Sequence, residues 1–188
     1  MINRNPPGKS SLLLSEPFMM DPNFKRAVVL LCEHSAEGSV GFVLNQPAPV
    51  KLPDLTDVLP GSEAFSVCIG GPVEQENIQF IHNCYDKLQS GDEIGQGVYW
   101  GGSFETLRIL IENKAIDPSE VKFFIGYSGW QPGQLDRELQ TNTWMVCNAY
   151  NPDLVFEKNG DNLWKEAVVA LGPKYAHVAQ FPENPMWN

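Results

Sequence analysis

The sequence carries little positive charge. Its 188 residues include 13 Lys and Arg against 23 Asp and Glu, which gives a formal net charge of −10 at pH 7. A protein that binds nucleic acid without sequence preference needs a Lys or Arg for each phosphate that it contacts. The basic residues form no cluster along the chain, and no helix-turn-helix pattern is present. Direct binding to nucleic acid is therefore not expected.

Long hydrophobic runs are also missing. The longest run, residues 27–32, is far too short to cross a bilayer. Residues 1–14 contain no apolar run of signal-peptide length, and Pro6 and Pro7 interrupt them. We therefore expect a cytoplasmic protein that is not associated with a membrane.

Cysteine is scarce and does not form a framework. The four residues lie in or beside apolar stretches rather than in loops: Cys32, Cys68, Cys84 and Cys147. In a cytoplasmic chain of this size, such cysteines are expected to be free buried thiols rather than disulfides.

The composition is that of an ordinary globular protein, with 43% hydrophobic and 19% charged residues. No internal repeat or low-complexity linker divides the chain. We therefore expect one domain over residues 1–188, with a loose leader at 1–9 and a proline-rich tail at 173–188.

The hydrophobic pattern predicts more strands than helices, and several strands follow one another through short turns. This favours an α+β fold with a mixed, mainly antiparallel sheet that includes a small barrel-like part and is flanked by helices. The expected strands are 10–15, 26–33, 39–45, 64–69, 77–82, 94–100, 121–125 and 143–147. The expected helices are a short one at Pro53, then 103–114, 134–140 and a last one ending near Leu171.

Residues 121–139 hold the densest group of special backbone residues. The strand 121–125 is expected to end at Gly126, and residues 129–133 lead into the polar helix 134–140. Free backbone N–H groups at Gly133 and Gln134 could bind an anion there, and Gly129 would let a ligand approach the backbone closely. The alternative is that these glycines only shape a turn beneath a buried Trp130.

Ser128 invites comparison with a nucleophile elbow, which has the pattern G-x-S-x-G. Here Gly126 precedes the serine at the required spacing, but Gly129 comes one residue early. No His or Asp partner can be assigned by spacing. We expect Ser128 to be a turn residue, and no catalytic residue is assigned.

Two Cys–His pairs could form a metal site. Cys32 and His34, and likewise His82 and Cys84, are two residues apart and would share a strand face, so neighbouring strands could assemble a tetrahedral zinc site. The spacing is not that of the usual chelating knuckle, and Cys32 continues an apolar run as a core residue would. We therefore expect no metal and no cofactor. A hydrolase-like or metal-dependent enzyme that uses His34 and His82 stays as the alternative.

Several blocks of the sequence together resemble the AlgH/YqgE family. They are residues 18–26, residues 28–47, Gly70-Gly71-Pro72-Val73, residues 126–139 and Trp144, in the family's order across residues 10–172. The resemblance implies a bacterial cytoplasmic protein with a mixed sheet, a small closed barrel and flanking helices. It also implies a regulator of transcription with no established biochemical activity.

The leading hypothesis is a non-enzymatic binding or regulatory protein. It would hold a small anionic ligand or a protein partner in a crevice rich in glycine and amide groups. Regulation through a protein partner would reconcile the family's regulatory role with the acidic charge. The candidate ligand-binding residues are Asn45, Gly70, Gly71, Gly129, Trp130, Gly133 and Gln134.

Overall fold

The computed structural model describes residues 5–57, 59–156 and 160–182 of the chain. This part contains nine β-strands and six α-helices, followed by two 3-10 helices. The strands are β1 (Leu12–Ser15), β2 (Val28–Ser35), β3 (Gly38–Val43), β4 (Val67–Ile69), β5 (Val73–His82), β6 (Asp92–Gly95), β7 (Val98–Trp100), β8 (Val121–Trp130) and β9 (Trp144–Cys147). The helices are α1 (Leu52–Leu55), α2 (Tyr85–Leu88), α3 (Phe104–Glu112), α4 (Gln134–Gln140), α5 (Asp153–Phe156) and α6 (Gly160–Ala170), and the 3-10 helices span Pro173–Tyr175 and Val178–Gln180.

The strands form one mixed sheet in the order β6-β7-β5-β8-β3-β2-β1-β9, with β4 beside β8 outside this path. β4 runs parallel to β8, and the other pairings are antiparallel. The predicted α+β fold with a mainly antiparallel sheet is confirmed. The prediction of a barrel-like part is wrong, because in the described chain the end strands β6 and β9 do not pair and the sheet stays open.

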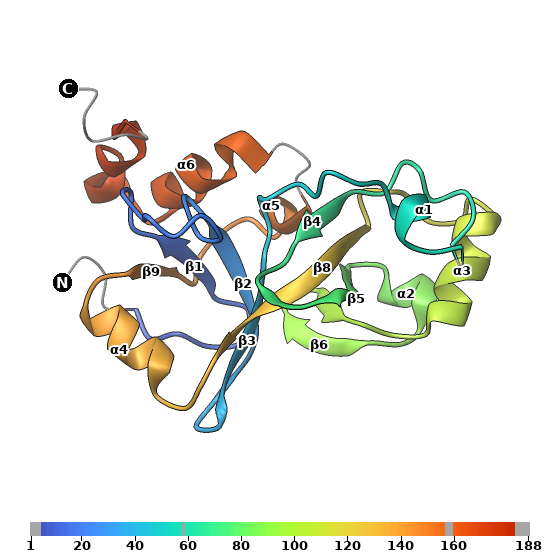
Figure 1. The fold of residues 1–188 in the computed structure, drawn as a ribbon, viewed down its shortest axis with the longest axis horizontal. Helices are drawn as coiled ribbons and strands as arrows, with labels where there is room; N and C mark the ends of the chain where they lie inside the picture. The colour runs from blue at the N-terminus through green and yellow to red at the C-terminus, as the bar shows by residue number, and fades with distance from the viewer. Residues whose placement is uncertain (1–4, 58, 157–159, 183–188) are drawn as a thin grey trace.

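The path of β8 explains why the sheet does not close. Figure 1 shows β8 crossing the molecule between two groups of strands, which we call the β1 half (β1, β2, β3 and β9) and the β5 half (β4, β5, β6 and β7). The first part of β8 pairs with β4 and β5, and its last three residues pair with β3. A strand shared in this way spreads the sheet into two halves instead of curling it back on itself.

Gly126 allows β8 to continue where the sequence predicts its end. Its φ is +66°, and a Cβ there would lie 2.6 Å from the carbonyl oxygen of Val73. Only glycine adopts this conformation at little cost and leaves room for the neighbouring strand. Ser128 is therefore a buried strand residue rather than a turn residue, and its hydroxyl donates a hydrogen bond to the carbonyl oxygen of Gly70 at 3.0 Å.

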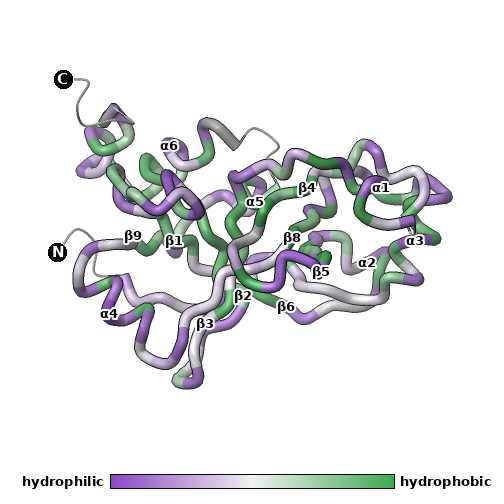
Figure 2. The backbone as a smooth tube through the Cα atoms, viewed as in Figure 1, coloured by the Kyte–Doolittle hydropathy of each residue, from purple (hydrophilic) through white to green (hydrophobic). Residues whose placement is uncertain are grey.

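Helices cover the β1 half on both faces. Along β1, Leu12 and Leu14 join the core that contains residues of α6, while Leu13 joins the core that contains Leu135 of α4. Successive strand residues point to opposite faces, so a strand covered twice has to be apolar throughout. Figure 2 shows this contrast, with hydrophobic segments along the central strands and hydrophilic ones along α4.

The β5 half has its own core beneath the helices α1 to α3. Phe80, Leu107 and Phe123 are fully or almost fully buried there. Ser103 caps α3 as the sequence indicates, because its hydroxyl accepts a hydrogen bond from the backbone N–H of Thr106. This half therefore has an apolar centre of its own, while Ile81, Ile94 and Val98 on its strands join the core beneath α6.

The predicted single strand 94–100 is a hairpin instead. β6 and β7 pair through a two-residue turn at Gln96 and Gly97, whose φ values are +54° and +76°. Two positive φ values are the mark of the tight turn that suits the twist of a hairpin. The short helices α2 and α5 were also not expected from the sequence.

Both ends of the described chain pack against the body. Asn5, in the expected leader, donates a side-chain hydrogen bond to the carbonyl oxygen of Val146 in β9. In the expected tail, the carbonyl oxygen of Phe181 accepts a hydrogen bond from Arg26 at 2.6 Å, and the rings of Phe181 and Phe18 stack. Residues 1–4 and 183–188 lie outside the described chain. Among the helices that the structure describes, none has the length and hydropathy of a membrane span.

Candidate functional site

A cavity of about 510 Å³ lies where the β2–β3 hairpin meets the end of β8 and the start of β5. We call it the hairpin cavity. It sits at the junction of the two halves of the sheet, because the hairpin belongs to the β1 half and β5 to the other. The lining residues that matter for its chemistry are Glu33, Glu37, Ser39, Tyr127, Gly129 and Trp130.

The hairpin approaches β8 closely because of Gly38. Ala36 and Glu37 form the turn, and Ser39 pairs with Trp130. A Cβ on Gly38 would lie 2.4 Å from the carbonyl oxygen of Trp130, and the φ of Gly38 is +133°. A larger residue at this position would push the hairpin away from β8.

Trp130 forms a fixed wall of the cavity. Its indole N–H donates to Oε2 of Glu138 in α4 at 2.8 Å, and the indole N–H of Trp144 donates to the same oxygen at 2.7 Å. The other carboxylate oxygen of Glu138 accepts from Gln134 at 2.8 Å. Two indoles held edge to face by one carboxylate make this wall rigid.

The charge of the cavity is negative. Glu33 and Glu37 are exposed at its rim, and neither has an ion-pair partner among the described residues. Its lining, as described, includes no Lys, Arg or His. The cavity therefore favours a cation or a neutral hydrogen-bond donor over the anion that the sequence led us to expect.

Of the seven predicted ligand-binding residues, Gly129 and Trp130 line the hairpin cavity. Gly70 and Gly71 do not line it. They let the turn before β5 pack closely behind β8: a Cβ on Gly71 would lie 2.3 Å from the backbone of Tyr127. These two glycines are therefore needed for packing.

The other three predicted residues also serve the fold. The side-chain oxygen of Asn45 accepts from the backbone N–H of Val28 at 2.8 Å, and its amide group donates to the carbonyl oxygen of Arg26 at 2.8 Å. Gly133 precedes α4, and Gln134 accepts a hydrogen bond from the backbone N–H of Gln131. Two of the seven predicted residues therefore line the hairpin cavity, and the other five are not among its lining residues.

No pattern in the sequence predicts three of the cavity residues, Glu33, Ser39 and Tyr127. They come from three strands and meet only through the sheet order β5-β8-β3-β2. A local signal existed in Gly38, which directly follows the hairpin turn, but its partner Trp130 is distant in the sequence.

The two Cys–His pairs do not meet, so the four-ligand zinc arrangement is wrong. β2 and β5 are separated in the sheet by β3 and β8. His34 instead contacts the hydroxyl of Ser39 at 2.8 Å, and Cys32 is buried in the core beneath α6. The described residues include no cluster of three or more His, Cys, Asp or Glu side chains suited to a metal ion. All four cysteines are buried and free, as predicted.

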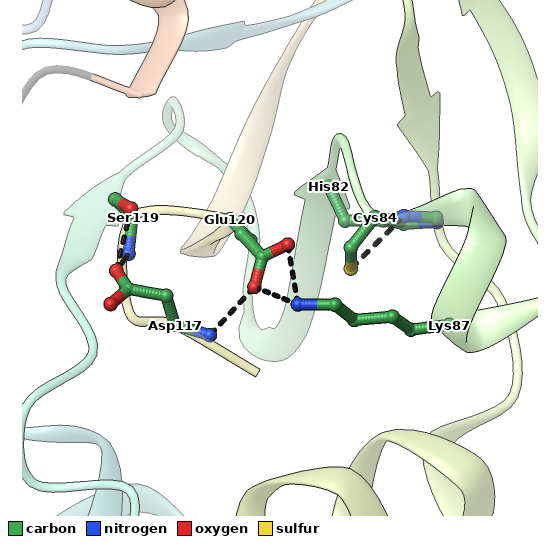
Figure 3. Close-up of polar contacts among 6 residues, drawn as sticks. All are labelled: His82, Cys84, Lys87, Asp117, Ser119 and Glu120. Atoms are coloured by element: carbon green, nitrogen blue, oxygen red, sulfur yellow. Dashed lines mark hydrogen bonds and ion pairs between the residues drawn. The ribbon is translucent and has the colours of Figure 1, made fainter. Parts of the chain in front are cut away.

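His82 and Cys84 form a buried pair behind α2 (Figure 3). Nε2 of His82 lies 3.0 Å from the carbonyl oxygen of Ser90, which can only accept, so Nε2 carries the proton and Nδ1 faces the sulfur of Cys84 at 3.7 Å. Burial lowers the pKa of His82 and raises the pKa of the Cys84 thiol to about 11. Both groups are therefore neutral near pH 7. Neither side chain has exposed surface, so this geometry gives a substrate no access to the sulfur.

Comparisons with known proteins agree with the motifs. The AlgH-like family model matches residues 12–176. A UPF0301 protein of Chlorobium limicola is 38% identical over 184 residues, which cover 97% of this chain and 95% of the relative. UPF0301 protein CT0663 of Chlorobaculum tepidum has the same identity and coverage. The solution structure of the AlgH protein from Pseudomonas aeruginosa has a TM-score of 0.74 and 26% identity, with 97% of this chain and 98% of that chain covered. The fold, the ordered motifs and these relatives show that the chain belongs to the AlgH-like family.

Proposed function

We propose that this protein is a binding protein that holds a basic side chain of a protein partner in the hairpin cavity and catalyses no reaction on it. It would act as a cytoplasmic regulator through that partner rather than by contact with DNA. The observation that carries the proposal is the combination of two unpaired carboxylates at the rim with an aromatic wall.

The size of the cavity suits a side chain with part of its backbone. Ligand sites range from about 300 to 1,000 Å³, and the hairpin cavity measures about 510 Å³. Gly129 is exposed and has no side chain, so the backbone of a bound segment could approach β8 there.

The lining favours Arg or Lys at the centre of that segment. The half-buried ring of Tyr127 offers a face for a cation, and Arg stacks well on such a face. Glu33 and Glu37 can accept the N–H groups of a guanidinium. The net charge of −10 would also draw a basic partner toward the protein.

Calorimetric titration with an acetylated and amidated tetra-arginine peptide tests the proposal. We expect the wild-type protein to bind this peptide and not tetra-glutamate. The double variant Glu33→Gln/Glu37→Gln should weaken binding about tenfold, which corresponds to about 1.4 kcal/mol.

A matched control separates the cavity from the net charge. Glu93→Gln/Glu166→Gln removes the same two charges from exposed positions on β6 and α6, and it should leave the affinity within about twofold, as expected for surface charges outside the site. Equal losses of affinity in both double variants would mean that peptide binding depends only on the net charge of the protein, and the proposal would be wrong.

A further inference from the structure

A second cavity, of about 550 Å³, lies in the β5 half. The loop before β4, helix α2, the end of α3 and the loop that leads into β8 surround it. We call it the loop cavity. The lining residues that matter here are Phe65, Lys87, Ile111, Lys114, Ile116 and Glu120.

The floor of the loop cavity is apolar. Phe65, Ile111 and Ile116 are each less than a tenth exposed and belong to the core of the β5 half. Ala64 and Ala115, which also line the cavity, are small and exposed, so they leave its entrance open. A ligand that fills this space would bury an apolar body against the floor.

Two carboxylates line the rim, those of Asp117 and Glu120, and both accept hydrogen bonds from other residues of the protein. Both oxygens of Glu120 accept from Lys87, at 2.8 and 2.7 Å, and one of them also accepts the backbone N–H of Asp117 at 2.7 Å. Asp117 in turn accepts from the backbone N–H and the hydroxyl of Ser119. Figure 3 shows this chain of contacts from Lys87 to Ser119.

Lys114 is the second lysine that lines the loop cavity, beside Lys87, which is paired with Glu120. Its ammonium group is exposed and has no hydrogen-bond or ion-pair partner among the described residues. The carbonyl oxygens of Ile109, Leu110 and Ile111, near the end of α3, accept backbone N–H groups from the turn that follows the helix. Lys114 is therefore the lining cation whose charge is not paired with a carboxylate among the described residues.

We propose that the loop cavity binds a small monocarboxylate with an alkyl or aryl body. The body packs on Phe65, Ile111 and Ile116, and the carboxylate pairs with Lys114. This site does not depend on the hairpin cavity, because it lies in the other half of the sheet and prefers the opposite charge.

Isothermal titration with octanoate tests this site, and octylamine serves as a probe of equal length and opposite charge. Octanoate should bind the wild-type protein at least tenfold more tightly than octylamine. Lys114→Glu should weaken octanoate binding about tenfold. Lys165→Glu, which makes the same charge change on an exposed residue of α6, should not alter it.

A steric variant tests the place of binding separately from charge. Ala64→Trp at the exposed entrance fills the loop cavity without disturbing a buried residue, and it should abolish octanoate binding. The proposal is overturned if octanoate gives no binding, if octylamine binds as tightly, or if either Lys114→Glu or Ala64→Trp leaves the affinity unchanged. Each of these outcomes leaves the tetra-arginine titration of the hairpin cavity unaffected.

Discussion

At the scale of single residues, a few polar side chains hold the backbone and the aromatic walls in place. Glu138 joins two indoles that come from β8 and β9. Asn45 ties two backbone groups on either side of Ala27. Amide and carboxylate side chains that look available for a ligand in the sequence are therefore occupied in the fold. The hydrogen bonds of these side chains stabilise the backbone and the aromatic residues around the hairpin cavity.

Replacing Glu138 should destabilise the protein. In Glu138→Leu the indole N–H groups of Trp130 and Trp144 lose their acceptor, and each unsatisfied buried donor costs about 1–3 kcal/mol. We expect the free energy of unfolding in urea to fall by about 3 kcal/mol. Glu166→Leu, on the exposed face of α6, should change it by less than about 0.5 kcal/mol. A loss in Glu138→Leu as small as in this control would contradict the role given to Glu138.

The buried His82 should make stability depend on pH. Burial lowers its pKa in the folded protein, so the unfolded chain, whose His titrates near about pH 6.5, binds the proton more readily. Its contribution to stability is full above about pH 6.5 and is lost as the pH falls toward the lowered pKa. One group can add a slope of up to about 1.4 kcal/mol per pH unit in this window.

Urea unfolding at several pH values between 7.5 and 5 measures this slope. His82→Asn should be less stable at pH 7.5, since it loses the contact with Ser90, but its stability should fall less steeply with acid. Parallel pH profiles for the wild-type protein and His82→Asn would show that His82 does not titrate as argued.

At the scale of elements, local signals predict the longer helices well, but they miss the full length of the two ten-residue strands, β5 and β8. The bounds of α4 agree with the prediction because the helix is set by its own polar sequence after Gly133. β8 continues past Gly126 because pairing with Val73 and Ser39, distant in the sequence, overrides the local tendency of glycine to end a strand. The hairpin of β6 and β7 differs from the predicted single strand because Gln96 and Gly97 form a turn within the predicted range.

Gly126→Ala should test the continuity of β8. The substitution adds a strained backbone at φ +66° and a Cβ that lies 2.6 Å from the carbonyl oxygen of Val73. We expect a loss of about 2–3 kcal/mol in unfolding free energy. Gly97→Ala has the same strain at φ +76° but no atom within 4 Å of the new Cβ, so it should cost only about 1 kcal/mol. Equal losses would show that the close approach to β5 does not matter.

At the scale of the whole molecule, the fold class follows from the order of strands and turns, but the cavities do not. Glu33, Tyr127 and Trp130 meet because β8 crosses from one half of the sheet to the other. No pattern along the chain reports such a meeting, since it depends on which strands become neighbours. The sequence indicates how many strands to expect, but it does not indicate whether the sheet closes. The expected barrel-like part is therefore wrong although most of the strands are predicted.

The acidic balance of the molecule should prevent binding to DNA. With 13 basic against 23 acidic residues, the protein repels a polyanion at low salt, where screening is weakest. A gel-shift titration with duplex DNA of unrelated sequence at 50 mM salt should show no complex at micromolar protein. A salt-sensitive complex there would support direct contact with DNA over action through a protein partner.

The most direct test of the central claim is a map of backbone amide shifts during titration with tetra-arginine. We expect the shifts to concentrate on residues 33–40 of the β2–β3 hairpin and on residues 127–131 at and just after the end of β8, and to need about tenfold more peptide in Glu33→Gln/Glu37→Gln. Shifts that gather on another surface, or that persist unchanged in this variant, would contradict the claim that the hairpin cavity is the binding site.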